Sequence, residues 1–159
     1  MRGISLFLLL LSLSIFQNCG VDDIQLPEND LEGKIEGAAW VYGTANAYRR
    51  TTDGQYEASF ISIEESPSNP CGLPSPGRPH VKAIFRPDFG NFAVSPIAID
   101  DNQVQVIFQV SNARALTANS GFLEVFDIRG NTVFGYLQAT EDINSNFVEG
   151  RVEIELCDL

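Results

Sequence analysis

Histidine, tryptophan and methionine are almost missing from this sequence, since each occurs once in 159 residues. The single histidine, His80, excludes every site that needs two imidazole groups. Basic side chains are also scarce, with 10 Lys and Arg against 21 Asp and Glu and a net charge of −11. Nucleic-acid backbones are bound by clustered Lys and Arg, so we expect no nucleic-acid partner.

Motifs of the common enzyme classes are missing as well. The chain has no Gly-x-Ser-x-Gly, Ser-x-x-Lys, His-Glu-x-x-His, Walker or dinucleotide-binding sequence. We therefore expect a non-catalytic protein. A hydrolase that uses an unrecognised pair of carboxylates is the least favoured alternative, because 21 acids place pairs somewhere by chance.

One long apolar run is present, and it lies at the N-terminus. It extends from Ile4 to Phe16 behind a short positive start that contains Arg2. As a helix the run would span about 20 Å, which is shorter than the roughly 30 Å core of a bilayer. A positive start and an apolar run of this length predict a secretory signal peptide over residues 1–18.

The run ends in Phe16-Gln17-Asn18-Cys19-Gly20, which resembles a lipobox, the sequence at which signal peptidase II cuts before a cysteine that is then acylated. Phe16 and Asn18 depart from the usual Leu and small residue, as in the looser boxes of Bacteroidota-type and spirochaete lipoproteins. The resemblance implies that Cys19 carries palmitate-type acyl chains and that residues 19–33 form a lipidated tether. It also implies an outer-membrane location, on the periplasmic or cell-surface face. An ordinary secreted protein is the alternative.

Two further cysteines, Cys71 and Cys157, remain once Cys19 is assigned to the lipid. Exported proteins meet an oxidising compartment, so an even pair predicts a Cys71–Cys157 disulfide. A metal site and a catalytic thiol assisted by His80 are the alternatives. Both are disfavoured, because two thiols and one histidine are too few ligands and a thiol enzyme needs a neighbouring base.

Residues 34–159 have the pattern of one all-β domain. Apolar and polar residues alternate most clearly from Val148 to Leu156 and from Val104 to Val110, as in half-buried strands. Five prolines between residues 66 and 79 predict a long loop. We expect a single-domain antiparallel β-sandwich, with a small β-barrel as the alternative. The predicted strands are 40–50, 56–65, 80–86, 91–95, 103–110, 122–128, 132–140 and 147–157.

Several short motifs of this domain are similar to those of a group of small Bacteroidota lipoproteins with an uncharacterised β-domain. They are Gly37-Ala38-Ala39-Trp40, Cys71, Gly135, Val148-Glu149-Gly150 and the final Cys157. The resemblance implies an all-β fold and an envelope location. It implies no catalytic mechanism.

Aromatic side chains provide a candidate binding site. Trp40, Tyr42 and Tyr48 have the same parity on one predicted strand, so we expect them on one face. A flat aromatic platform of this kind suits stacking on sugar rings, which would make the domain a glycan-binding module of the outer surface. The alternative is that these rings face the core, as large rings usually do.

A weak calcium motif lies near the C-terminus. Asp142, Asn144 and Asn146 stand at alternate positions, as in the first half of an EF-hand loop. Phe147 occupies the place of the required glycine, so the favoured alternative is an Asx-rich turn and no cofactor is expected. Together these observations predict a non-catalytic, lipid-anchored envelope protein that acts by binding, or by assembly with another envelope protein.

Overall fold

The computed structural model describes residues 28–97 and 100–157. Within these ranges the chain forms ten strands and one 3-10 turn, η1 (Ile63–Glu65), and no helix there is long and apolar enough to cross a bilayer. The strands are β1 (Glu32–Ile35), β2 (Ala38–Arg49), β3 (Tyr56–Ser62), β4 (His80–Phe85), β5 (Gly90–Val94), β6 (Gln103–Ser111), β7 (Arg114–Thr117), β8 (Ser120–Arg129), β9 (Thr132–Glu141) and β10 (Asn146–Cys157). The prediction of an all-β domain is confirmed.

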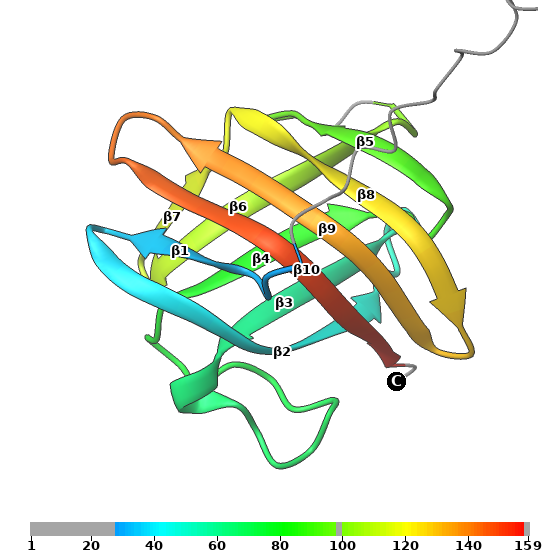
Figure 1. Cartoon of the computed structure of the whole chain (residues 1–159), viewed down its shortest axis with the longest axis horizontal. Helices are drawn as coiled ribbons and strands as arrows, with labels where there is room; N and C mark the ends of the chain where they lie inside the picture. The colour runs from blue at the N-terminus through cyan, green and yellow to red at the C-terminus, as the bar shows by residue number, and fades with distance from the viewer. Residues whose placement is uncertain (1–27, 98–99, 158–159) are drawn as a thin grey trace, which may run out of the picture.

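The strands form one sheet in the order β4-β3-β2-β1-β10-β9-β8-β5-β6-β7, with additional β4–β6 and β2–β10 pairings. Strands β8, β9 and β10 cross the front of the domain in Figure 1, with β3, β4 and β6 behind them. The domain is therefore a sandwich. Because strand pairing continues from one layer into the other, the sheet is also closed on itself, as in the small β-barrel that was the predicted alternative. Most pairs are antiparallel, whereas β10–β2 and β5–β6 are parallel.

The core lies between the two layers and follows the predicted alternation. In β6, every second residue from Val104 to Val110 is buried, and in β10 the same holds from Val148 to Ile154. These side chains meet buried residues of the facing strands in one cluster. Burial of apolar surface at about 25 cal/mol per Å² makes this cluster the main stabilising contact between the layers.

The N-terminal boundary of the domain lies earlier in the chain than the sequence indicates. Leu31, inside the expected tether, is fully buried, and its backbone N–H donates to the Arg151 carbonyl at 3.1 Å. Gly150 has a φ of +149°, and a Cβ there would lie 2.5 Å from the Asp30 carbonyl oxygen. Glycine at position 150 therefore lets the residues before β1 pack against β10.

The predicted long loop over residues 66–79 is present and is fastened to the sheet. Cys71 and Cys157 form the predicted disulfide, with their Cα atoms 5.9 Å apart, so the loop is covalently tied to the end of β10. The Asn46 side-chain amide on β2 donates to the carbonyls of Pro70 and Gly72, at 3.2 and 2.5 Å. A covalent bond and partly buried hydrogen bonds thus hold this segment against the sheet, although its prolines exclude it from any ladder.

The first prediction concerns the disulfide, which links two cysteines that are 86 positions apart in the sequence. We expect the double variant Cys71→Ser, Cys157→Ser to lose up to about 4 kcal/mol of unfolding free energy, because the unfolded chain regains loop entropy. Urea unfolding of both proteins measures the loss. The non-reduced mature protein should show no free thiol at Cys71 or Cys157. An unchanged urea midpoint would show that the bridge contributes nothing to stability.

Candidate functional site

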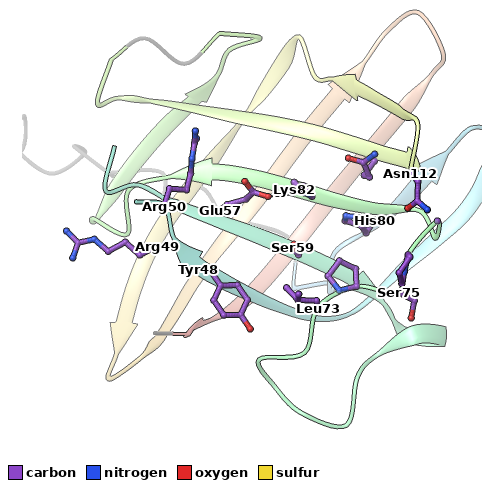
Figure 2. A pocket seen from close by; sticks show the side chains of 14 residues that line it. Tyr48, Arg49, Arg50, Glu57, Ser59, Leu73, Ser75, His80, Lys82 and Asn112 are labelled. Atoms are coloured by element: carbon purple, nitrogen blue, oxygen red, sulfur yellow. Dashed lines mark hydrogen bonds and ion pairs between the residues drawn. The ribbon is translucent and has the colours of Figure 1, made fainter. Parts of the chain in front are cut away.

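The candidate site is a groove of about 520 Å³ on the outer face of the sheet. Its floor is formed by β3, β4 and β6, and the segment Leu73–Gly77 of the proline-containing loop forms one wall (Figure 2). This volume is within the range of small-ligand sites. The lining residues are Tyr48, Arg49, Arg50, Glu57, Ser59, Leu73, Pro74, Ser75, Pro76, Gly77, His80, Lys82, Gln109 and Asn112.

Strand alternation explains why the floor is polar. Ala58 and Phe60 on β3, and Val81 and Ala83 on β4, are fully buried in the core. Successive side chains of a strand point to opposite faces, so the residues between and beside them point outward. Those outward residues are Glu57, Ser59, His80 and Lys82, and Figure 2 shows them along the floor.

The lining of the groove contains more cations than carboxylates. Three cations line it, Arg49, Arg50 and Lys82, and one carboxylate, Glu57. Lys82 Nζ lies 2.9 Å from Glu57 Oε1, and Arg50 forms an ion pair with Asp53 at 3.4 Å. Arg49 makes no ion pair within the described part of the chain. Arg50 and Lys82 are thus each paired with an acid, and Figure 2 shows the Arg49 side chain extending away from the other labelled residues of the groove.

His80 carries an unused acceptor. Its Nδ1 lies 2.9 Å from the Arg78 carbonyl, which can only accept, so Nδ1 holds the proton and Nε2 offers a lone pair. Burial lowers the pKa of His80 below 6.5, and the hydrogen bond to Arg78 only partly opposes this. Nε2 is buried and has no hydrogen-bond partner among the described residues.

The residue opposite His80 explains why its nitrogen is unsatisfied. Gln109 on β6 pairs with His80 across the ladder. Its side-chain amide is turned instead to the Ser111 carbonyl, at 2.5 Å, and the Arg114 carbonyl, at 3.3 Å. Because a buried polar atom without a partner is unfavourable, a hydrogen-bond donor that reached Nε2 would stabilise the ring.

The aromatic platform predicted from Trp40, Tyr42 and Tyr48 does not form. Trp40 is 5% exposed and belongs to the core, and Tyr42 packs against that core with its ring 6.5 Å from Phe60. Burial raises the pKa of Tyr42 to about 12, and its hydroxyl donates to the Glu153 carbonyl at 2.6 Å. The alternative interpretation, that these rings face the core, holds for Trp40 and Tyr42.

A β-bulge separates Tyr48 from the other two rings. The β2–β3 register shifts between Tyr42 and Thr44, so the residues that face the core change from even to odd numbers. Tyr48 consequently lies on the outer side, where its hydroxyl donates to the Cys71 carbonyl of the loop. Equal parity along the sequence predicts a common face only while the ladder is regular.

The residues of the calcium motif are engaged in a turn. Asn146 Oδ1 accepts from the Glu36 N–H at 2.6 Å, Asn144 Oδ1 accepts from Arg114 at 3.1 Å, and Asp142 Oδ2 accepts from Asn119 at 2.8 Å. Their oxygens therefore bind separate donors, and no group of three potential metal ligands occurs among the described residues. The turn matches the Asx-rich alternative.

The turn is organised by a buried carboxylate that sequence analysis did not single out. Glu141 is 5% exposed and accepts from the Ile143 and Asn144 N–H groups and from the Asn144 and Asn146 amides. Burial raises the pKa of Glu141, but these hydrogen bonds outweigh it and hold the pKa below the usual 4.5. Its negative charge is thus stabilised by donors of its own turn.

Of the predicted sites, Cys19 lies outside the described residues, and Tyr48 is the one aromatic candidate that lines the groove. The groove itself was not predicted. Its available clue was polar alternation at Glu57, Ser59 and Lys82.

Comparison of the chain with protein-family models, curated proteins and solved structures finds no match. The functional argument therefore depends on the geometry of the groove.

The second prediction concerns the turn around Glu141. We expect Glu141→Gln to lower the free energy of unfolding by about 1–3 kcal/mol at pH 7, because an amide cannot accept all of these bonds. A depressed pKa stabilises the fold above the unfolded value of 4.5, and this contribution is lost as the pH falls through the folded pKa.

Urea unfolding between pH 7 and pH 3 measures both effects. The variant should lack the part of the acid destabilisation that comes from Glu141. Glu32→Gln, at an exposed position on β1, is the control and should follow the unsubstituted protein. Equal stability of both variants at pH 7 would contradict the assigned role.

Proposed function

We propose that this chain is a non-catalytic, lipid-anchored envelope protein that binds a small polar ligand in the groove between the loop wall and strands β3, β4 and β6. The observation that carries the proposal is the buried Nε2 of His80, because His80 lines the groove and this nitrogen has no hydrogen-bond partner in the described structure. A preformed recess of about 520 Å³ with an unsatisfied acceptor and a polar floor has the features of a ligand site.

The chemistry of the groove supports binding over catalysis. A nucleophile needs a hydrogen-bonded general base, and a base needs a free lone pair directed at the nucleophile. His80 uses Nδ1 on a backbone carbonyl, and Nε2 contacts no hydroxyl or thiol of the described residues. Glu57 forms an ion pair with Lys82 at 2.9 Å, so its carboxylate is engaged by a cation.

The lipid anchor is proposed from the sequence. The lipobox-like segment ending at Cys19 supports acylation and outer-membrane attachment of the kind found in Bacteroidota-type lipoproteins. The Cys71–Cys157 disulfide is consistent with export to an oxidising compartment. More than one acyl chain on Cys19 would hold the domain stably at a membrane surface.

The third prediction tests the anchor. We expect the N-terminal peptide of the mature protein from a diderm bacterial host to begin at Cys19 and to carry the mass of its acyl chains. The variant Cys19→Ser should remain uncleaved at this position and lose palmitate labelling. Mass spectrometry of the peptide and palmitate incorporation measure both results. An unmodified peptide that starts elsewhere would refute lipid anchoring and leave groove binding untouched.

The fourth prediction tests the groove as a binding site. The probes are maltotriose, trigalacturonate and trialanine. They are added to residues 19–159 with Cys19→Ser, produced directly without the segment 1–18 so that no detergent is needed. We expect at least one probe to shift the amide resonances of Ser59, Gly77 and Lys82. Ser59→Tyr, which fills the floor, should abolish these shifts.

Ser75→Tyr, at an exposed position of the wall, is a second blocking variant in case the floor substitution unfolds the domain. Lys34 on β1, outside the groove, provides the control resonance. No shift at the groove with any of the three probes would refute the proposed function.

A further inference from the structure

We propose that a recess beside the first residues of β2 binds an extended, basic peptide segment of a partner protein, which adds a strand to the sheet. This site goes beyond the proposed function, because the recess and the groove share no lining residue. Four observations lead to it: an open strand edge, a space of suitable width, a buried donor without a partner, and a carboxylate without an ion pair.

The open edge lies beside the first four residues of β2. Ala38–Val41 pair with β1 on one side. On the other side, β3 pairs with β2 only as far as the Tyr42–Ser62 pair, and the chain then enters η1. Figure 1 shows η1 leading out of the sheet into the proline-containing loop. In the described structure, the place that a longer β3 would take beside Ala38–Val41 is therefore left without a strand.

Two residues of this edge direct their backbone groups to the empty place. The Tyr42 N–H donates to the Leu31 carbonyl at 3.0 Å, and the β1–β2 register continues from that pair. Alternate residues of an antiparallel ladder bond to the partner strand, so the N–H and C=O groups of Ala39 and Val41 point away from β1. Neither residue forms a backbone hydrogen bond to a turn or loop of the described chain. An added strand binds through groups of this kind.

The space at this edge is a recess of about 340 Å³. The start of β2 lines one side of it, and η1 with Arg78 and Pro79, which precede β4, lines the other. Strands two places apart in a sheet are roughly 10 Å apart, so one extended chain fits between these sides. Val41 and Ile63 also line the recess and are 45% and 63% exposed, so they offer an apolar contact to a side chain of the peptide.

A buried donor lines the same recess. Trp40 is 5% exposed, and its indole Nε1 has no hydrogen-bond partner in the described structure. This nitrogen can only donate, and a buried donor without an acceptor is unfavourable. Each peptide unit carries a carbonyl, and a carbonyl that reached Nε1 would remove this cost. A peptide thus supplies partners for both the indole and the strand edge.

The charge of the recess favours a basic segment. Two acids, Glu64 and Glu65, line it together with one cation, Arg78. Arg78 forms an ion pair with Glu65 at 2.9 Å, whereas Glu64 is exposed and has no ion pair in the described part of the chain. The whole protein has a net charge of −11. A Lys or Arg next to the apolar residue of the peptide therefore complements this edge better than an acid does.

The fifth prediction uses the peptide acetyl-Lys-Val-Ile-Val-Lys-amide as a probe for residues 19–159 with Cys19→Ser. We expect the peptide to slow hydrogen exchange of the Ala39 and Val41 amides, because the added strand accepts their hydrogen bonds. It should also shift the indole N–H resonance of Trp40, which is the only tryptophan of the chain. Nuclear magnetic resonance measures both effects.

Changes to the probe separate backbone pairing from side-chain contact. One form is N-methylated at both valines and another at the isoleucine, so each lacks donors on one edge. One form should bind at least about tenfold more weakly than the parent peptide, and the other nearly as tightly. Replacing both Lys by Glu should also weaken binding about tenfold, and added NaCl should reduce this difference. The Ser59 amide, in the groove, is the control resonance and should not respond to any of these peptides.

Variants of the protein test the edge and the charge. Val41→Pro removes an N–H that makes no bond to β1, so it should weaken the parent peptide about tenfold, whereas Val41→Ile keeps the N–H and is the matched control. Glu64→Lys should reverse the preference between the Lys and Glu peptides. Glu28→Lys, at an exposed position outside the recess, should leave that preference unchanged. Thermal unfolding verifies that each variant is folded, and the methylated peptides decide the question even if Val41→Pro unfolds.

Three outcomes would overturn the inference. They are equal binding of both methylated peptides, unchanged exchange at Ala39 and Val41, and dimerisation of the free protein that Val41→Pro abolishes. The last result would assign this edge to a second copy of the chain. None of them affects the proposed ligand site of the groove, because its probes are followed at Ser59, Gly77 and Lys82.

Discussion

The disulfide between Cys71 and Cys157 is the constraint on which the groove depends. It fixes a proline-containing loop, which cannot join a ladder, to the end of the last strand of a closed sheet. Asn46 and Tyr48 on β2 then satisfy three carbonyls of that loop with their side chains. The wall thus stands over the floor because covalent and hydrogen bonds replace the backbone pairing that its prolines prevent.

Strand alternation determines which faces of this domain are polar. Alternation sends apolar side chains inward, and on β3 and β4 it sends Glu57, Ser59, His80 and Lys82 outward below the loop. The same alternation on β10 places acids on an outer face, which contributes to the net charge of −11. The groove, whose lining includes three cations and one carboxylate, thus differs in composition from the acidic outer face of β10.

The limits of sequence prediction are clearest at β2. Trp40, Tyr42 and Tyr48 share parity, yet the bulge between Tyr42 and Thr44 places Tyr48 on the opposite side from Trp40. A bulge adds one residue to one strand, and its local signal here is Gly43, the residue between the two paired positions, because an isolated glycine in a strand pattern often marks a bulge. Strands β1 and β7 were missed for a related reason. Each has four residues, too few for a periodic pattern to emerge.

The sequence by itself determined the all-β class, the loop over residues 66–79, the strong strands β6 and β10, and the Cys71–Cys157 pair, because each follows from local periodicity, proline content or cysteine count. Only the tertiary structure decided that Leu31 joins the core, that Glu141 organises the last turn, and that His80 and the loop wall line the same groove. These three depend on which distant residues become neighbours when the ladder closes. The strand register and the β2 bulge determine which residues become neighbours, and both are properties of strand pairing across the whole sheet.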